Sequence, residues 1–126
     1  MITPTPRQMA GIYDMLRTFH PFNVWRLPTA KRVRFVTDPK AWLTERHARR
    51  LLGMHWMKGR RHTIFIAPHK TLADMVATMA HEMIHVHEAV NDVPCDKRNN
   101  AYIHGVMFQK IASVICSELG FNRQRF

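Results

Sequence analysis

Two histidines and one glutamate lie close together in the sequence HEMIH, residues 81 to 85. On an α-helix, residues four positions apart lie about one turn apart on the same face, so His81 and His85 can bind one metal ion together. Glu82 would then lie beside that ion, where it can take a proton from a water molecule. This combination predicts metal-assisted hydrolysis, with zinc as the expected metal.

A catalytic zinc ion usually has three protein ligands and an open fourth position, so a third ligand is needed. We expect His104, which stands in the sequence HGVMF at the start of a second apolar-periodic segment. It can face the first helix if the two helices pack antiparallel. If a carboxylate took its place, the candidates would be Glu88, Asp92 and Asp96. We expect surface or packing roles for the other histidines, which are His20, His47, His55, His62, His69 and His87.

The HEMIH sequence lies inside a longer segment with helical periodicity. Thr71 is the expected N-cap, with Asp74 three residues later as in a capping box. One apolar stripe is predicted, formed by Leu72, Met75, Val76, Met79, Met83, Val86 and Val90. His81 and His85 each follow a methionine of this stripe by two residues, roughly 200° around the helix. We therefore expect the ligand face to oppose the core face and to line a cleft.

The rest of the chain predicts the elements that position this helix. The expected elements are a helix from Thr5-Pro6 that ends before Pro21, a strand at 31–37, a helix from Asp38-Pro39 to about Leu52, strands at 52–57 and 62–67 joined as a hairpin, the HEMIH helix, and a last helix that ends at Gly120. This order predicts a small α+β fold with a three-stranded sheet packed on about four helices.

The composition predicts a single domain over residues 1–126. A chain of 126 residues with 46% hydrophobic residues can form one core, and is short for two. We expect no membrane span and no signal peptide, because apolar runs are too short. Cys95 and Cys116 give no disulfide framework. The expected location is therefore the cytoplasm or nucleoid, or the host cytoplasm if a virus encodes the chain.

The charge distribution indicates an anionic partner. Lys and Arg outnumber Asp and Glu by 19 to 9, and eleven of these basic residues lie between residues 26 and 61. Such a cluster favours contact with DNA, single-stranded or at a junction, although it could also be a solvated face. The candidate contacts are Arg26, Lys31, Arg32, Arg34, Arg49, Arg50, Arg60 and Arg61. Trp25, Trp42 and Trp56 could stack on unpaired bases or lie in the core.

These residues resemble the SprT-like zinc metallopeptidases, the family that includes the DNA–protein crosslink protease Spartan. HEMIH and HGVMF match the family's HExxH helix and its later HGxxF or HGxxW sequence. Upstream, Phe22-Asn23, Leu27-Pro28 and the sequence VRFV are similar to the family's N-terminal segment and first strand. The paired cysteines of the family's zinc ribbon are lacking, so the resemblance implies a minimal catalytic domain.

The resemblance also implies a mechanism and a mode of substrate binding. It implies a zincin-like fold in which His81, His85 and His104 bind zinc and Glu82 acts as general base. The strand at 62–67, or its hairpin partner, would form the rim of the cleft and bind an extended peptide by adding it to the sheet edge. The protein substrates would be ones associated with DNA.

Two other functions remain open on the sequence. A metal-dependent amidase with a small substrate could use the same three histidines. A non-catalytic nucleic-acid-binding or particle-associated structural protein could use the metal only to hold two helices together. A closed shell of four ligands would favour the structural role, and an open position would favour catalysis.

Overall fold

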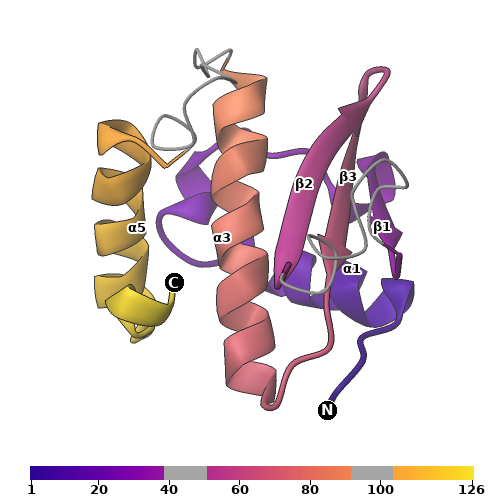
Figure 1. The fold of residues 1–126 in the computed structure, drawn as a ribbon. Coiled ribbons are helices and arrows are strands. Elements are labelled where there is room, and N and C mark those ends of the chain that lie inside the picture. Colours follow the sequence, from indigo (N-terminus) through magenta and orange to yellow (C-terminus); the bar gives the residue numbers. More distant parts are fainter. Residues whose placement is uncertain (39–50, 92–103) are drawn as a thin grey trace.

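The computed structural model describes residues 1–38, 51–91 and 104–126. These ranges contain a three-stranded sheet and three α-helices (Figure 1). The elements are α1 (Pro6–Leu16), β1 (Val33–Val36), β2 (Gly53–Lys58), β3 (Arg61–Ile66), α3 (Leu72–Val90) and α5 (Val106–Leu119), with short 3₁₀ helices at Phe22–Val24, Ala30–Arg32 and Arg123–Arg125. The prediction of a small α+β fold with a three-stranded sheet is confirmed. The additional helix expected from Asp38-Pro39 falls mostly outside the described residues.

The sheet has the strand order β1-β3-β2. Strand β1 runs parallel to β3, and β2 pairs antiparallel with β3 as a hairpin in which Lys58 lies opposite Arg61. The two-residue turn begins at Gly59, whose φ of 63° lies in the region that such tight hairpin turns require. The hairpin is therefore confirmed, with each strand shifted by one residue from its predicted range. The predicted strand at 31–37 is shorter, because residues 30–32 form a 3₁₀ helix.

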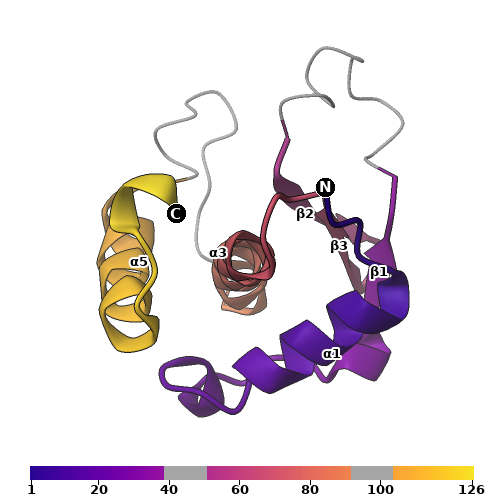
Figure 2. The same ribbon diagram turned by 90° about the horizontal axis from the view of Figure 1, so that it is seen from below.

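The helices cover one face of this sheet. Ile64 and Ile66 of β3 and Val33 of β1 belong to the hydrophobic core, and the strand alternation places all three on the same face. Helices α1 and α3 pack on that face, and α5 contacts α3. Figure 2 shows α3 lying between the sheet and α5. The helix that carries HEMIH is therefore the central element of the fold.

Local signals fix where α3 and its neighbours begin and end. The hydroxyl of Thr71 accepts a hydrogen bond from the main-chain nitrogen of Asp74 at 3.1 Å, as predicted for the N-cap of α3. Thr5 caps α1 in the same way and forms a complete capping box with Gln8. Gly120, with a φ of 74°, ends α5 in the left-handed conformation. Helix α5 runs back antiparallel to α3, as expected (Figure 1).

The prediction of a single apolar stripe on α3 is wrong. The first and last residues of the stripe are exposed, and in between more residues are buried than the stripe contains. Leu72 is 58% exposed and Val90 is 42% exposed. The buried residues of α3 are Met75, Met79, Ala80, Glu82, Met83, Ile84 and Val86. The physical reason is that α3 contacts α1, β2, β3 and α5, so it is buried on more than one side. The ligand face consequently does not oppose the core, because α5 and β2 both pack close to it.

Gly53 brings β2 unusually close to α3. A Cβ atom at this position would lie 2.8 Å from Thr78 Cγ2, 3.1 Å from the main-chain oxygen of Phe65 and 3.3 Å from Glu82 Cγ. The close approach explains a glycine in the first position of an edge strand. It also places β2 directly beside the glutamate of HEMIH. None of the described helices is long and apolar enough to cross a membrane.

We predict that Gly53→Ala lowers the free energy of unfolding by about 1–3 kcal/mol, because the methyl group forces β2 and α3 apart. The matched control is Gly11→Ala in α1, where no atom lies within 4 Å of the added Cβ. The control should be neutral or slightly stabilising, because alanine favours a helix. Denaturant unfolding of the two variants measures the difference. Equal stabilities would show that β2 does not pack against α3 at Gly53.

Candidate metal centre

Three histidine side chains meet between α3 and the start of α5. His104 Nε2 lies 3.2 Å from His81 Nε2 and 3.2 Å from His85 Nε2. His81 and His85 are one turn apart on α3, and His104 precedes the first residue of α5 by two positions. The antiparallel packing of the two helices brings His104 back toward α3. The three imidazoles could hold one metal ion.

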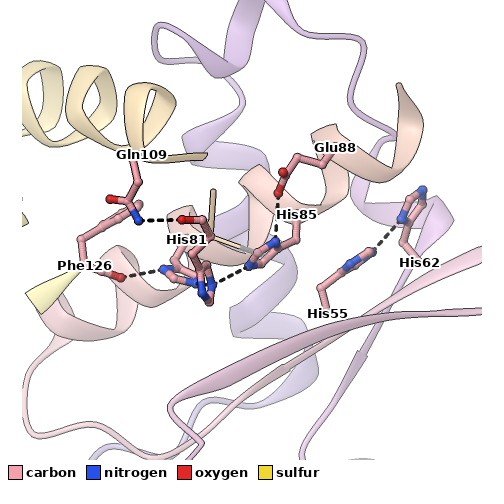
Figure 3. Close-up of polar contacts among 8 residues, drawn as sticks. His55, His62, His81, His85, Glu88, Gln109 and Phe126 are labelled. Atoms are coloured by element: carbon pink, nitrogen blue, oxygen red, sulfur yellow. Dashed lines mark hydrogen bonds and ion pairs between the residues drawn. The ribbon is translucent and has the colours of Figure 1, made fainter. Parts of the chain in front are cut away.

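The other ring nitrogens of the two α3 histidines are held by fixed acceptors (Figure 3). His81 Nδ1 lies 2.6 Å from the main-chain oxygen of Phe126, and His85 Nδ1 lies 3.0 Å from Glu88 Oε1. Both oxygens can only accept, so Nδ1 of each ring carries the hydrogen. In the neutral imidazole, Nε2 then presents its lone pair, which is the form that binds a metal.

Neither of these partners is predicted from the sequence. Glu88 was considered only as a substitute metal ligand, whereas its carboxylate contacts the nitrogen of His85 that faces away from His104. Its spacing of three residues from His85 on a helix is a signal that could have identified it. The main-chain oxygen of Phe126 has no signal in the sequence. The other two substitute ligands, Asp92 and Asp96, lie outside the described residues.

Phe108 forms an apolar floor under the three imidazoles. Its ring is 3% exposed, and its centroid lies 4.9 Å from that of His81, 5.0 Å from that of His85 and 4.6 Å from that of His104. His104 is oriented further by Gln109, whose side-chain nitrogen donates to the main-chain oxygen of His104 at 2.9 Å. The phenylalanine of HGVMF therefore has a direct structural role at the site.

Burial favours the neutral form of His81 and His104. Desolvation, together with the neighbouring His85, lowers the pKa of His81 to about 4. Desolvation also lowers the pKa of His104, again with a contribution from His85. Both rings are consequently unprotonated at neutral pH, and their lone pairs are available to a metal ion without first losing a proton.

Glu82 lies buried at the edge of this cluster. It is 4% exposed, and its Oε2 has no hydrogen-bond partner among the described residues. Burial raises the pKa of Glu82 to about 7, although the nearby His85 acts in the opposite direction. A buried carboxylate oxygen without a partner costs free energy and is rare in native proteins. The arrangement fits a carboxylate whose partner is a water molecule or a substrate at the histidine cluster.

A cavity of about 240 Å³ opens beside these residues. His81 and Glu82 form part of its lining, together with the start of β2 and the C-terminal residues Arg125 and Phe126. The histidine cluster and the buried carboxylate thus adjoin a space that a substrate group could enter. Such a cavity with a few polar groups is typical of binding sites.

The strand order decides which strand could form the rim of a substrate cleft. Strand β3 is paired on both sides, by β1 and by β2. It therefore has no free edge for a further strand. Within the described part of the chain, strand β2 lies at the edge of the sheet. Of the two strands considered from the sequence, only β2 can add an extended peptide.

The other histidines of the described ranges have packing or surface roles, as expected. His69 is buried between Thr78 Oγ1 at 2.8 Å and the main-chain oxygen of Ala67 at 2.6 Å. His87 stacks on Trp25 with ring centroids 4.0 Å apart. His20 is exposed and lies 3.6 Å from Glu118. His47 lies outside the described residues.

His55 and His62 form a pair that the sequence analysis did not foresee. His55 Nε2 lies 2.9 Å from His62 Nδ1 across the β2–β3 hairpin (Figure 3). Desolvation, the neighbouring His62 and then His85 lower the pKa of His55 to about 3. The register of the hairpin makes these two residues diagonal neighbours, so the pair follows once the two-residue turn is assigned.

Six of the eight candidate nucleic-acid contacts lie in the described ranges, and all six are exposed. They are Arg26, Lys31, Arg32, Arg34, Arg60 and Arg61. None of them forms an ion pair with another described residue. Trp25 is half-buried against the core, so its stacking surface faces His87. Trp56 is also half-buried, whereas Trp42, Arg49 and Arg50 lie outside the described residues.

Comparisons of the chain with protein-family models, with curated proteins and with solved structures found no match. The resemblance to SprT-like metallopeptidases therefore depends on the residues of the chain itself. The two sequences that carry it, HEMIH and HGVMF, supply the three histidines that meet in the structure.

We predict that Glu88→Ala weakens metal binding by roughly 10–100-fold, because His85 loses the carboxylate that fixes its tautomer and orientation. Glu88→Gln should recover part of this loss, since an amide oxygen can still accept from Nδ1. Competition with a chromophoric chelator measures the affinity. Glu118→Ala is the matched control, because Glu118 is an exposed glutamate whose ion pair among the described residues is with His20. If the Glu88 and Glu118 variants bind metal equally well, Glu88 has no role in orienting His85.

Proposed function

We propose that this protein is a zinc-dependent endopeptidase that cleaves peptide bonds in proteins associated with DNA. The observation that carries the proposal is the convergence of three imidazole Nε2 atoms beside a buried glutamate. Zinc binds imidazole nitrogens at about 2.0–2.1 Å in a tetrahedron, which separates neighbouring nitrogens by roughly 3.3 Å. The separations of 3.2 Å to His104 Nε2 agree with that geometry.

The donor set favours zinc over magnesium and calcium. Three neutral imidazoles without a carboxylate are poor ligands for magnesium or calcium, which prefer oxygen. The described cluster contains three histidines and no fourth protein ligand. An open position of this kind is typical of catalytic zinc sites rather than structural ones. Zinc held here would supply a positive charge that acidifies water and polarises a peptide carbonyl.

Glu82 is the proposed general base. Its carboxylate is buried beside the cavity, where it can take the proton of an attacking water molecule and pass it to the departing amine. Its raised pKa makes it a stronger base than an exposed glutamate, and the unpaired Oε2 is free to accept that proton. His81 and His85 keep their orientation through Phe126 and Glu88, so the carboxylate acts next to a preorganised cluster.

Strand β2 is the proposed platform for the substrate. An extended peptide that pairs with its outer edge would pass over α3, because Gly53 holds β2 directly against Glu82. Main-chain pairing of this kind recognises an extended conformation rather than a particular sequence. We therefore expect unfolded or flexible segments of proteins as substrates.

DNA is the proposed partner of the basic surface. The net charge is +10, and the six described basic candidates are exposed and unpaired with other described residues. Cations in this arrangement bind phosphates through contacts that salt weakens. A peptidase recruited in this way would act on proteins bound to DNA, in the cytoplasm or at the nucleoid.

Digestion assays test the proposal. Casein and a DNA-binding protein are incubated with the zinc-loaded protein, with and without single-stranded DNA, and with the protein after zinc removal by a chelator. We expect zinc-dependent cleavage of both substrates, and faster cleavage of the DNA-binding protein when DNA is present. DNA binding without proteolysis would support the structural alternative. Hydrolysis of small amides without cleavage of either protein would support the amidase.

A further inference from the structure

A groove leads from Glu82 along the N-terminal half of α3. The cavity of about 240 Å³ beside Glu82 is followed by a second cavity of about 360 Å³. Leu52, Thr78 and Arg125 line both cavities, so the two adjoin at these residues. The groove therefore begins at the proposed reaction centre and continues toward the N-terminal end of α3, as far as Ala73.

The wall of this groove opposite β2 comes from the C-terminal residues. Phe126 is tied to the site by its main-chain oxygen, which accepts from His81 Nδ1 at 2.6 Å. Its ring also lies against those of His81 and Phe121, with centroid distances of 5.4 Å and 6.0 Å. Arg125 is consequently held at the side of the groove by its neighbour in the chain. These contacts fix the wall to the histidine cluster.

Apart from Glu82 at the inner end, two basic residues and one acidic residue line the groove. Arg125 lines both cavities, and Lys70 lines the outer one. The acidic group of the outer cavity, Asp74, lies 3.5 Å from Arg125 Nη2, and the two side chains are 35% and 70% exposed. One long and exposed contact leaves most of the donors of the guanidinium available. Several other lining residues are apolar, such as Leu52, Ala73 and Phe121.

We infer that this groove binds the substrate chain on one side of the scissile bond and selects an acidic side chain there through Arg125. This inference rests on the proposed peptidase function. A carboxylate can form a two-point ion pair with the guanidinium, whereas a lysine or arginine of the substrate meets a like charge. Substrates that carry Glu within three residues of the cleaved bond are favoured over the same substrates with Lys by roughly 2–5-fold in kcat/KM, the size expected for an exposed charge pair.

This preference would affect which parts of a DNA-bound protein are cut. Segments that contact phosphates are rich in Lys and Arg, and the groove rejects them. Acidic flexible segments, which face away from DNA, would enter it. The basic surface and the groove would then act on different parts of the same complex.

The test uses peptides that differ only in having Glu, Gln or Lys at one position within three residues of the cleaved bond. Arg125→Gln should abolish the preference, and Arg125→Glu should reverse it in favour of Lys. The matched control is Arg7→Glu, which makes the same charge change at an exposed position on α1. This control should keep the preference of the unaltered protein. Equal kcat/KM values for the Glu and Lys peptides in the unaltered protein would overturn the inference.

A binding measurement separates this inference from the proposed function. The zinc-loaded Glu82→Gln protein is titrated into fluorescent Glu and Lys peptides, and the anisotropy is followed. Tighter binding of the Glu peptide that is lost in Glu82→Gln/Arg125→Gln supports the groove, even if no peptide is ever cleaved. Binding without discrimination, or no binding of any peptide, overturns the groove. If the unaltered protein cleaves no peptide but Glu82→Gln still binds the Glu peptide more tightly, only the proposed peptidase function is overturned.

Discussion

Glu82→Gln is expected to lower peptide hydrolysis by roughly 10²–10⁴-fold while leaving the bound zinc in place. Glutamine has nearly the same shape as glutamate, so it fits the buried space beside Gly53 and keeps β2 and α3 in register. It cannot accept a proton from water. The metal site itself should be unchanged, because Glu82 takes no part in the hydrogen bonds that the structure describes for the three histidines.

Two measurements on the same sample check this result. Elemental analysis gives the zinc content, and turnover of the best peptide gives the loss of activity. Glu88→Gln serves as the control, because it makes the same chemical change at a glutamate that orients His85 rather than facing the cavity. It should affect metal affinity more than the turnover of the zinc-loaded protein. Turnover of Glu82→Gln within a few-fold of the unaltered protein would remove Glu82 from the role of general base.

His104→Ala is expected to weaken zinc binding by at least roughly 10²-fold. The apparent binding free energy of four-ligand zinc sites is about 10–16 kcal/mol, or roughly 3–4 kcal/mol per ligand. The two remaining histidines on α3 form only part of a site. The fold should survive, because His104 is exposed and precedes α5 rather than packing in the core.

Zinc titration with a competing chelator measures this loss, and thermal unfolding checks it independently. A ligand at 100 times its Kd stabilises a protein by about 2.7 kcal/mol, so the stabilisation of the unaltered protein by zinc should disappear in the variant. His20→Ala is the matched control. His20 is an exposed histidine, and its described contact is with Glu118 near the C-terminal end of α5. An unchanged zinc stoichiometry and affinity in His104→Ala would mean that the third ligand is another residue.

The features that the sequence predicted correctly are those with local causes. Thr5 and Thr71 cap helices through bonds to residues three positions away, and Gly120 ends α5 because it adopts a left-handed conformation. The hairpin follows from the glycine in its two-residue turn. The pair His81 and His85 follows from the helical period alone. His104 could be included because it faces the first helix if the two helices pack antiparallel.

The features that the sequence could not predict depend on contacts between distant residues. The main-chain oxygen that holds His81 comes from Phe126, 45 residues later in the chain. The order of the strands makes β3 central and β2 the edge, and neither strand has a local signal for its position. The burial of Glu82 depends on the close approach of Gly53 from β2. The stripe on α3 was wrong for the same reason, because its burial is set by four neighbouring elements.

The residues on both sides of helix α5 contact the histidine cluster. His104 comes just before its first turn, and Phe126 follows shortly after its last turn and holds His81. Docking of this helix and retention of an ion bound by the three histidines would therefore be thermodynamically linked, and the linkage would be reciprocal. Loss of zinc should speed amide hydrogen exchange throughout α5, and a substitution that loosens the seam between α5 and α3 should release the ion by the same free energy. Helix α5 would thus stabilise the metal site, and a bound ion would in turn stabilise the docking of α5.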